Sequence, residues 1–394
     1  MIKKTLLTIL TIVILIVGYS VYENVSNQNK YLISVCNNSK WGYIDKSGKQ
    51  IIPFKYDEPG EFIDGLAPVC INGKYGFIDK TGKVVIPFEY DLADNFYEGL
   101  ALVQKNGKCG YVNKSGKLII PLKYETFTRF SEGLASACLN EKCGYIDKAG
   151  KEVIPLQYTR PDNYLAGLAA ESHFSTEDYS EGLAPVCKVD ETCGYVNKNN
   201  EVKIPFKYSA VTSFKDGYAA VESDGLWGLV NKEGEEVIPL KYPLFGTPEE
   251  GLVRACLPVG GGEYKCGFLD TKNRIVLPFK YPAAGGFTEG LAQVKVDKYR
   301  WFFINKQGKN VFESKYSVVG NFSEGLVSIC KPVNACGFVD KTGKVVVGLK
   351  YESVGRFKNG IAAVLVAGEE KWGIVDKTGK VIIQPQYDWT GLAF

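Results

Sequence analysis

The chain consists of one short unit written ten times. The unit is clearest over residues 41–74, WGYIDKSGKQIIPFKYDEPGEFIDGLAPVCINGK, and the next unit begins YGFIDKTGKVVIPFEYD. Its first position falls at Trp41, Tyr75, Cys109, Cys143, Cys193, Trp227, Cys266, Trp301, Cys336 and Trp372. The spacing is nearly constant, and only the intervals from Cys143 to Cys193 and from Trp227 to Cys266 are clearly longer. A fixed period of about 34–36 residues predicts a solenoid, a propeller or another repeat array.

The first half of each unit predicts a β-hairpin. The WGYID segment ends in Asp or Asn in all ten copies, and a turn such as Lys46-Ser47-Gly48 follows. The third turn position is Gly in eight copies and Asn in two, Asn200 and Asn273, and both residue types reach the left-handed region cheaply. This spacing is typical of a type I turn with a G1 bulge, so the WG and IPF segments should pair.

The second and third strands of the unit follow from its other motifs. The IPF segment, QIIPF in the first copy, is a continuous apolar run, which predicts burial on both faces and neighbouring units that sandwich each other. Its recurrent proline cannot donate to a ladder, so it should end the strand or lie on a free edge. The F-x-E-G-L-A box opens a third strand, which a short turn such as Asn72-Gly73-Lys74 joins to the next WG strand.

These elements predict an all-β chain. We expect a tandem array of about ten three-stranded antiparallel repeats over residues 31–394, forming an open superhelix or solenoid. The alternative is β-propeller-like closure. The open form is favoured because propeller blades usually have four strands, ten exceeds the usual blade number, and the ends show no clear split blade.

Residues 1–30 differ from the rest. Lys3 and Lys4 precede an uncharged span over residues 5–22, which is typical of a signal peptide or a signal anchor. The length of this span is near the lower limit for a membrane-spanning helix. The positive flank predicts an extracytoplasmic repeat array, either released or tethered to the cytoplasmic membrane by residues 5–22.

The cysteines support export independently. Four pairs flank the turn between the third strand and the next WG strand, where side chains can lie opposite one another at disulfide distance. The predicted disulfides join Cys138 to Cys143, Cys187 to Cys193, Cys256 to Cys266, and Cys330 to Cys336. Cys36, Cys70 and Cys109 have no partner in their own unit; Cys70 and Cys109 could bridge adjacent repeats, which would leave Cys36 free or intermolecular.

The longest interval, from Cys143 to Cys193, contains an insertion at about 159–178. Its segment YLAGLA resembles the box that follows at 179–184, and the insertion carries the only histidine, His173. With one histidine and no CxxC, the sequence predicts neither a zinc site nor a catalytic triad, and we expect no enzyme activity and no cofactor.

The motif [WYC]-G-[YF]-[IV]-[DN]-K-x-G-K, followed by IPxxY and EGLA, resembles the bacterial WG (or KWG) repeat family. The resemblance covers nearly the whole chain after residue 30. It weakens where Phe302 replaces the glycine and where Glu313, Gly348 and Gln384 replace the proline. The resemblance implies a non-enzymatic surface or envelope repeat protein and implies no reaction.

Two sets of charged residues recur at fixed positions of the unit. An acid precedes the box glycine, and we expect it to cap its turn rather than to form a ladder that binds a cation or a sugar amine. Lysines recur at the hairpin turn and before the repeated tyrosine. Since 47 basic residues face 44 acidic ones and only six are Arg, the composition disfavours nucleic acid as a partner.

Two functions follow as expectations. The first is a non-catalytic scaffold that binds an envelope or host protein, most naturally through the irregular centre at 159–186. The alternative is a carbohydrate or cell-wall-binding module that uses the repeated aromatics and lysines, which would have to be exposed at equivalent positions. The sequence assigns no binding residues, and membrane contact is expected only through the N-terminal segment if it is retained.

Overall fold

The computed structural model describes residues 31–159, 178–297, 300–314, 317–318, 320–331 and 335–392. The predicted export segment at 1–30 and nearly all of the predicted insertion, residues 160–177, lie outside the described residues.

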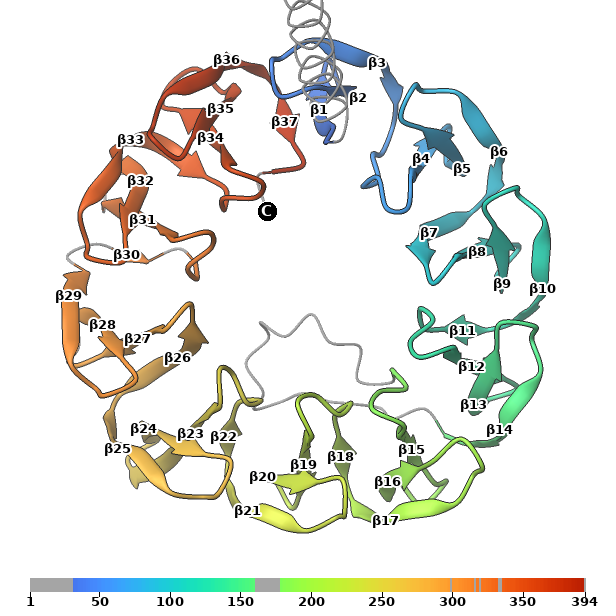
Figure 1. Ribbon diagram of the computed structural model, residues 1–394, viewed down its shortest axis with the longest axis vertical. Coiled ribbons are helices and arrows are strands. Elements are labelled where there is room, and N and C mark those ends of the chain that lie inside the picture. Colours follow the sequence, from blue (N-terminus) through green and yellow to red (C-terminus); the bar gives the residue numbers. More distant parts are fainter. Residues whose placement is uncertain are drawn as a thin grey trace, which may run out of the picture.

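The described residues form antiparallel β-sheets arranged as a closed ring (Figure 1). There are nine hydrogen-bonded sheets, and one of them has seven strands because it joins two repeat units. The ring therefore contains ten units of radially ordered strands. We call each unit a blade and number the blades 1 to 10 along the chain, beginning with the blade that contains β1.

The two middle strands of each blade are the box strand and the WG strand. The box strands are β1 (Ile33–Asn37), β4 (Leu66–Ile71), β8 (Leu100–Lys105), β12 (Leu134–Leu139), β15 (Ala184–Cys187), β19 (Tyr218–Ser223), β23 (Leu252–Gly260), β27 (Leu291–Lys295), β31 (Leu326–Lys331) and β34 (Ile361–Val366). The WG strands are β2 (Lys40–Ile44), β5 (Lys74–Asp79), β9 (Lys108–Asn113), β13 (Lys142–Asp147), β16 (Cys193–Val196), β20 (Leu226–Asn231), β24 (Glu263–Asp270), β28 (Trp301–Asn305), β32 (Ala335–Asp340) and β35 (Trp372–Asp376).

The IPF strand lies at the outer rim of each blade (Figure 1). These strands are β3 (Gln50–Tyr56), β6 (Val84–Tyr90), β10 (Leu118–Tyr124), β14 (Glu152–Tyr158), β17 (Val202–Tyr208), β21 (Glu236–Tyr242), β25 (Ile275–Tyr281), β29 (Asn310–Ser314), β33 (Val345–Val354) and β36 (Val381–Tyr387). Pro53, for example, lies inside β3 on this edge strand, where its missing N–H breaks no ladder, as the sequence predicts.

A fourth, innermost strand completes most blades, so the predicted count of three strands is too low. These strands are β7 (Leu92–Tyr97), β11 (Thr126–Phe127), β18 (Ala210–Val211), β22 (Leu244–Phe245), β26 (Ala283–Thr288), β30 (Ser317–Val318) and β37 (Trp389–Thr390). In blades 2 and 5 only single bridges occupy this place, Glu58 to Cys70 and Thr159 to Cys187. In blade 10 the long strand β33 itself continues inward to pair with β34.

The first sheet closes the ring. Its innermost strand, β37, comes from the end of the chain and pairs with β1, matching Val35 with Thr390 and Cys36 with Trp389. Asp388 N donates to Cys36 O at 2.9 Å, and Gly391 N donates to Ser34 O at 2.9 Å. The expectation of an open superhelix is therefore wrong, and the propeller-like alternative is the observed fold: a short strand at one end completes the sheet that the other end begins.

The hydrophobic core lies between adjacent blades. One cluster joins Tyr43 and Ile52 of blade 1 to Val69 and Ile78 of blade 2. Another joins blade 10 to blade 1 across the closure. Each interface between neighbouring blades has such a cluster, so the prediction that every unit is sandwiched by its neighbours is confirmed.

Candidate functional site

The turns of the blades fall on two faces of the ring. Because the four strands of a blade alternate in direction, the box turn and the hairpin turn after the WG strand share one face. The turn between the box and WG strands lies on the opposite face, with the connection to the next blade. The candidate site depends on which repeated side chains are already engaged on each face.

On the first face, the repeated acid binds the next blade. Glu98 accepts from the backbone N–H of Gly133 at 3.0 Å, and Lys148 of that next blade pairs with the same carboxylate at 2.9 Å. The carboxylate–glycine bond also joins Glu132 to Gly182, Glu181 to Gly217, Glu250 to Gly290, Glu289 to Gly325 and Glu324 to Gly360. The acid thus caps the neighbouring blade's turn, and the expectation that it caps its own turn is wrong.

The charges of this face are largely neutralised. Burial raises the pKa of Glu324, but the Lys377 ammonium and the Gly360 N–H outweigh burial and hold that pKa below its ordinary value. Lys306 and Lys341 pair in the same way with Glu250 and Glu289, each at 3.1 Å. These lysines and acids hold blades together.

The repeated aromatic residues are also internal. Tyr43 packs edge-on against Phe62 of the next blade, with ring centroids 5.1 Å apart, and donates its hydroxyl to Gly60 O at 2.8 Å. Among described residues, the tyrosines at the ends of the outer strands are at most 7% exposed: Tyr56, Tyr90, Tyr124, Tyr158, Tyr208, Tyr242, Tyr281, Tyr351 and Tyr387. The lysine before this tyrosine covers the ring, as Lys123 does over Tyr124 at 4.6 Å.

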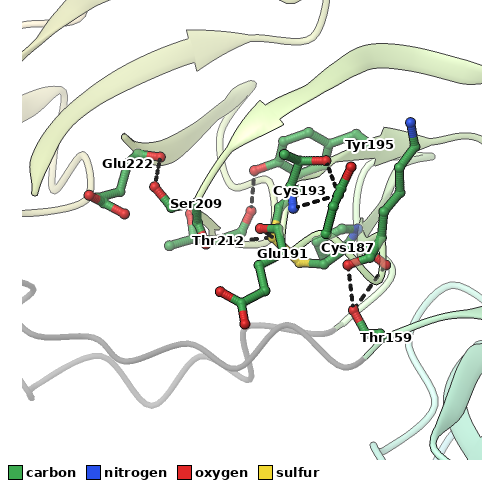
Figure 2. The surroundings of a disulfide bond; sticks show 12 residues. Thr159, Cys187, Glu191, Cys193, Tyr195, Ser209, Thr212 and Glu222 are labelled. Carbon is green, nitrogen blue, oxygen red and sulfur yellow. Dashed lines mark hydrogen bonds between the residues drawn. A yellow bond between two sulfur atoms is a disulfide. The ribbon is translucent and has the colours of Figure 1, made fainter. Parts of the chain in front are cut away.

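Four disulfides close the turn between box and WG strands, in the pairs that the sequence predicts: Cys138–Cys143, Cys187–Cys193, Cys256–Cys266 and Cys330–Cys336. Figure 2 shows the Cys187–Cys193 bond beside Tyr195, whose hydroxyl donates to Thr212 O at 2.6 Å, and Thr159, which donates to Cys187 O at 3.2 Å. Four disulfides are typical of an oxidising environment.

Cys36, Cys70 and Cys109 are free and buried. The suggested bridge between Cys70 and Cys109 is wrong, because each faces a different residue across its own sheet, Tyr75 and Gln104 respectively. Burial raises the pKa of the Cys109 thiol, which favours an unreactive protonated form.

A large hollow lies between blades 7 and 8, on the face that carries the disulfide turns. It is a groove of about 920 Å³, in the range of ligand pockets. Its wall includes Arg254, Tyr264 and Lys265 of blade 7 and Pro282 and Lys295 of blade 8. The β23–β24 hairpin extends beyond other such hairpins because of the insertion around Gly260–Gly262, which in the sequence lengthens the interval from Trp227 to Cys266.

A second cavity of about 380 Å³ lies on the other face, between blades 4, 5 and 6, and includes Arg129, Asp178 and Glu181. Its wall includes Asp178, at one end of the predicted insertion, whose residues 160–177, with His173, lie outside the described residues. Within the described residues, no group of three or more His, Cys, Asp or Glu side chains is placed to hold a metal ion. No helix in this part of the chain is long and apolar enough to cross a membrane.

The WG containing repeat family matches ten segments of the chain, at 41–75, 75–109, 110–143, 144–170, 194–227, 227–257, 267–299, 301–331, 337–369 and 372–392. These segments make up most of the sequence, and the chain belongs to this family. No curated protein has a matching sequence.

Among solved structures, the chain is similar to the eukaryotic initiation factor, with 9% identity, coverage of 91% of this chain and 96% of that one, and a TM-score of 0.48. It is also similar to the computationally designed Ika8 protein, with 12% identity, 73% and 93% coverage and a TM-score of 0.36. BamB from Moraxella catarrhalis matches with 12% identity, 75% and 87% coverage and a TM-score of 0.33. These similarities are too distant to bear on function.

Proposed function

We propose that this chain is a non-catalytic protein-interaction module that works outside the cytoplasm, in the bacterial envelope or beyond it. One observation carries the proposal: many side chains that recur along the array are engaged between blades, whereas the groove between blades 7 and 8 is lined by Arg254 and Lys295, two cations that the equivalent positions of the other units lack. A surface that is specific to one position in the ring favours a specific partner over a repeated polymer.

The glycan-binding alternative requires exposed aromatic platforms at equivalent positions. Instead, Trp227 and Trp372 are buried, Trp41 and Trp301 are half-buried, and the described repeat tyrosines are covered. Several recurrent lysines pair with carboxylates, as Lys148 and Lys377 do, and others lie over tyrosine rings, as Lys123 does over Tyr124. The repeat aromatics and many of these lysines thus have internal roles, which supports the protein partner.

An extracytoplasmic location rests on two independent features. The four disulfides indicate an oxidising environment, and residues 5–22 have the composition of an export signal or anchor. The partner would therefore be an envelope protein or a host protein.

The test presents the full chain, produced under oxidising conditions, to purified cell-wall sacculi and separately to detergent-solubilised envelope and host-surface proteins. We expect retention of a discrete protein and no sedimentation with sacculi. Salt-sensitive sedimentation with sacculi would favour the glycan alternative, and retention of neither material would contradict the proposal. The chain reduced and unfolded in urea, then diluted, serves as the control for non-specific adhesion.

A further inference from the structure

We propose that the groove between blades 7 and 8 binds an extended segment of a partner protein that carries an acidic side chain. This inference rests on the proposed function and deepens it by naming the chemistry of the partner. Three lines of evidence support it: a lysine whose repeat-equivalent acid is replaced, two cations found at no other equivalent position, and an end of β24 that extends beyond its outer neighbour β25 beside the groove.

The first line of evidence compares equivalent interfaces. In four other blades, the lysine just before the WG position pairs with an acid that starts the next blade: Lys40 with Asp57, Lys74 with Asp91, Lys108 with Glu125, and Lys371 with Asp388. At blade 7 the lysine is kept as Lys265, but the acid position is Pro282. Both residues line the groove, so a carboxylate from a partner would meet Lys265 where an internal carboxylate sits elsewhere.

The second line of evidence is added positive charge. Arg254 and Lys295 also line the groove. The residues equivalent to Arg254 are uncharged in the other nine units: Ser34, Pro68, Leu102, Ser136, Pro185, Ala220, Gln293, Ser328 and Ala363. Those equivalent to Lys295 are Cys, Gln, Glu or Leu. Two cations have thus been introduced at one interface only.

The cations are held in place and half-buried. The Arg254 guanidinium donates through Nη1 to Ala284 O at 2.8 Å, across the interface, and Lys295 Nζ lies 5.8 Å from the centroid of the Trp301 ring. Two acids, Glu263 and Asp297, also line the groove. Glu263 at the hairpin tip is exposed, and Asp297 pairs with Arg300 at 2.6 Å. The groove is therefore complementary to a negative side chain.

The third line of evidence is the open edge of β24. Its ladder with β25 ends at the pair Cys266–Tyr281, whereas its ladder with β23 continues to Glu263. Pro258 lies opposite Tyr264 and has no N–H to donate, so this pair is a non-hydrogen-bonded one. The backbone N–H and C=O of Tyr264 therefore face away from β23, at the part of β24 that extends beyond β25, where they can pair with an extended chain.

In one other blade, the lysine just before the WG position is present while the acid that starts the next blade is absent. Lys142 of blade 4 has Thr159 at the acid position. Thr159 donates instead to the backbone of the next turn, at Cys187 O and Lys188 O, so that interface is closed by an internal contact. At Pro282 no such hydroxyl exists, which sets the groove between blades 7 and 8 apart.

The test selects a random heptapeptide library, displayed on phage, against the full-length chain in mild detergent. We expect enrichment of sequences with Asp or Glu at one position flanked by β-forming residues. An enriched peptide, synthesised with a fluorophore, should bind about tenfold more weakly to Lys265→Ala and to Pro282→Asp. The second change restores the acid of the other blades and should occupy Lys265 internally. Lys241→Ala, which removes an exposed lysine from the rim of blade 6, should leave the affinity unchanged.

Each variant is first checked for an unchanged thermal unfolding midpoint, so that lost binding is not lost folding. Selection without acidic enrichment, or affinity that neither groove variant alters, would overturn the inference. The two proposals fail differently. If Pro282→Asp still retains the envelope or host protein captured by the parent chain, the proposed function stands and the groove is not its site. If the parent chain captures no protein, the proposed function itself fails.

Discussion

The glycine of the WG motif is required because the backbone of the outer strand leaves no room for a side chain. A Cβ on Gly144 would lie 2.3 Å from Ile154 O and 2.5 Å from Pro155 O, because the outer strand bulges over the WG strand there. Blade 8 has Phe302 in place of this glycine and Glu313 in place of the proline, and its two strands pair there without the bulge. The replacements of the glycine by Phe302 and of the proline by Glu313 therefore accompany a local change in how the two strands pair.

We predict that Gly144→Ala lowers the free energy of unfolding by about 2 kcal/mol, since backbone atoms cannot move aside as a flexible side chain would. Urea denaturation measures the change. Gly348→Ala is the matched control, because a Cβ there meets nothing within 4 Å, and it should shift stability by less than about 0.5 kcal/mol. Equal losses for both variants would refute the steric explanation.

At the scale of residues, the turns could be predicted from the sequence, whereas the roles of several repeated side chains could not. The positions of the left-handed glycines and the four cysteine pairs followed from local spacing. The repeated acid was assigned to its own turn, because no local signal shows that Glu98 reaches Gly133 in the next blade. Contacts between units depend on how the sheets stack, which one unit does not encode alone.

At the scale of elements, the disulfides and the large aromatics occupy equivalent places. Cys138 faces Cys143 in blade 4, while Leu365 faces Trp372 in blade 10, and Trp372 is 4% exposed. A covalent link and a buried indole thus hold the same pair of strands in different blades.

We therefore predict that the two changes Cys138→Ala and Cys143→Ala together cost about 2 kcal/mol, the value expected for so short a closed loop. The pair Cys138→Leu and Cys143→Trp, which copies blade 10, should recover at least half of that loss by burying apolar area. Thermal and urea unfolding compare the three chains. A Leu–Trp variant no more stable than the Ala–Ala variant would show that the two arrangements are not equivalent.

The innermost strand is the element that sequence reasoning missed. In blades 4, 6 and 7 it is very short, as β11, β18 and β22, and its segment has no alternating pattern. So short a strand forms only because it pairs with the box strand of the same blade, which the rest of the blade already holds in position. The groove at Pro282 could be predicted in part. An alignment of the ten units reveals that Pro282 replaces the acid, whereas the cavity beside it is visible only in the structure.

At the scale of the molecule, closure could not be predicted because it joins the two ends of the array. The strand that makes the join, β37, is as short as the innermost strands above, and its partner β1 belongs to the first unit of the chain. Two further contacts stabilise the same closure. Lys358 of blade 10 forms an ion pair with Glu61 of blade 2 at 2.6 Å, and Lys46 of blade 1 donates a hydrogen bond to Asn359 O at 2.9 Å.

The most direct test of the closed ring is zero-length carbodiimide cross-linking of the full chain, followed by mass spectrometry of the monomer. Closure predicts an amide between Lys358 and Glu61, which lie near opposite ends of the sequence, and its loss in Glu61→Gln. The link between Lys148 and Glu98 of adjacent blades serves as the internal control, because open and closed arrays both predict it. A monomer that gives the adjacent-blade link but never the Lys358–Glu61 link would contradict the ring.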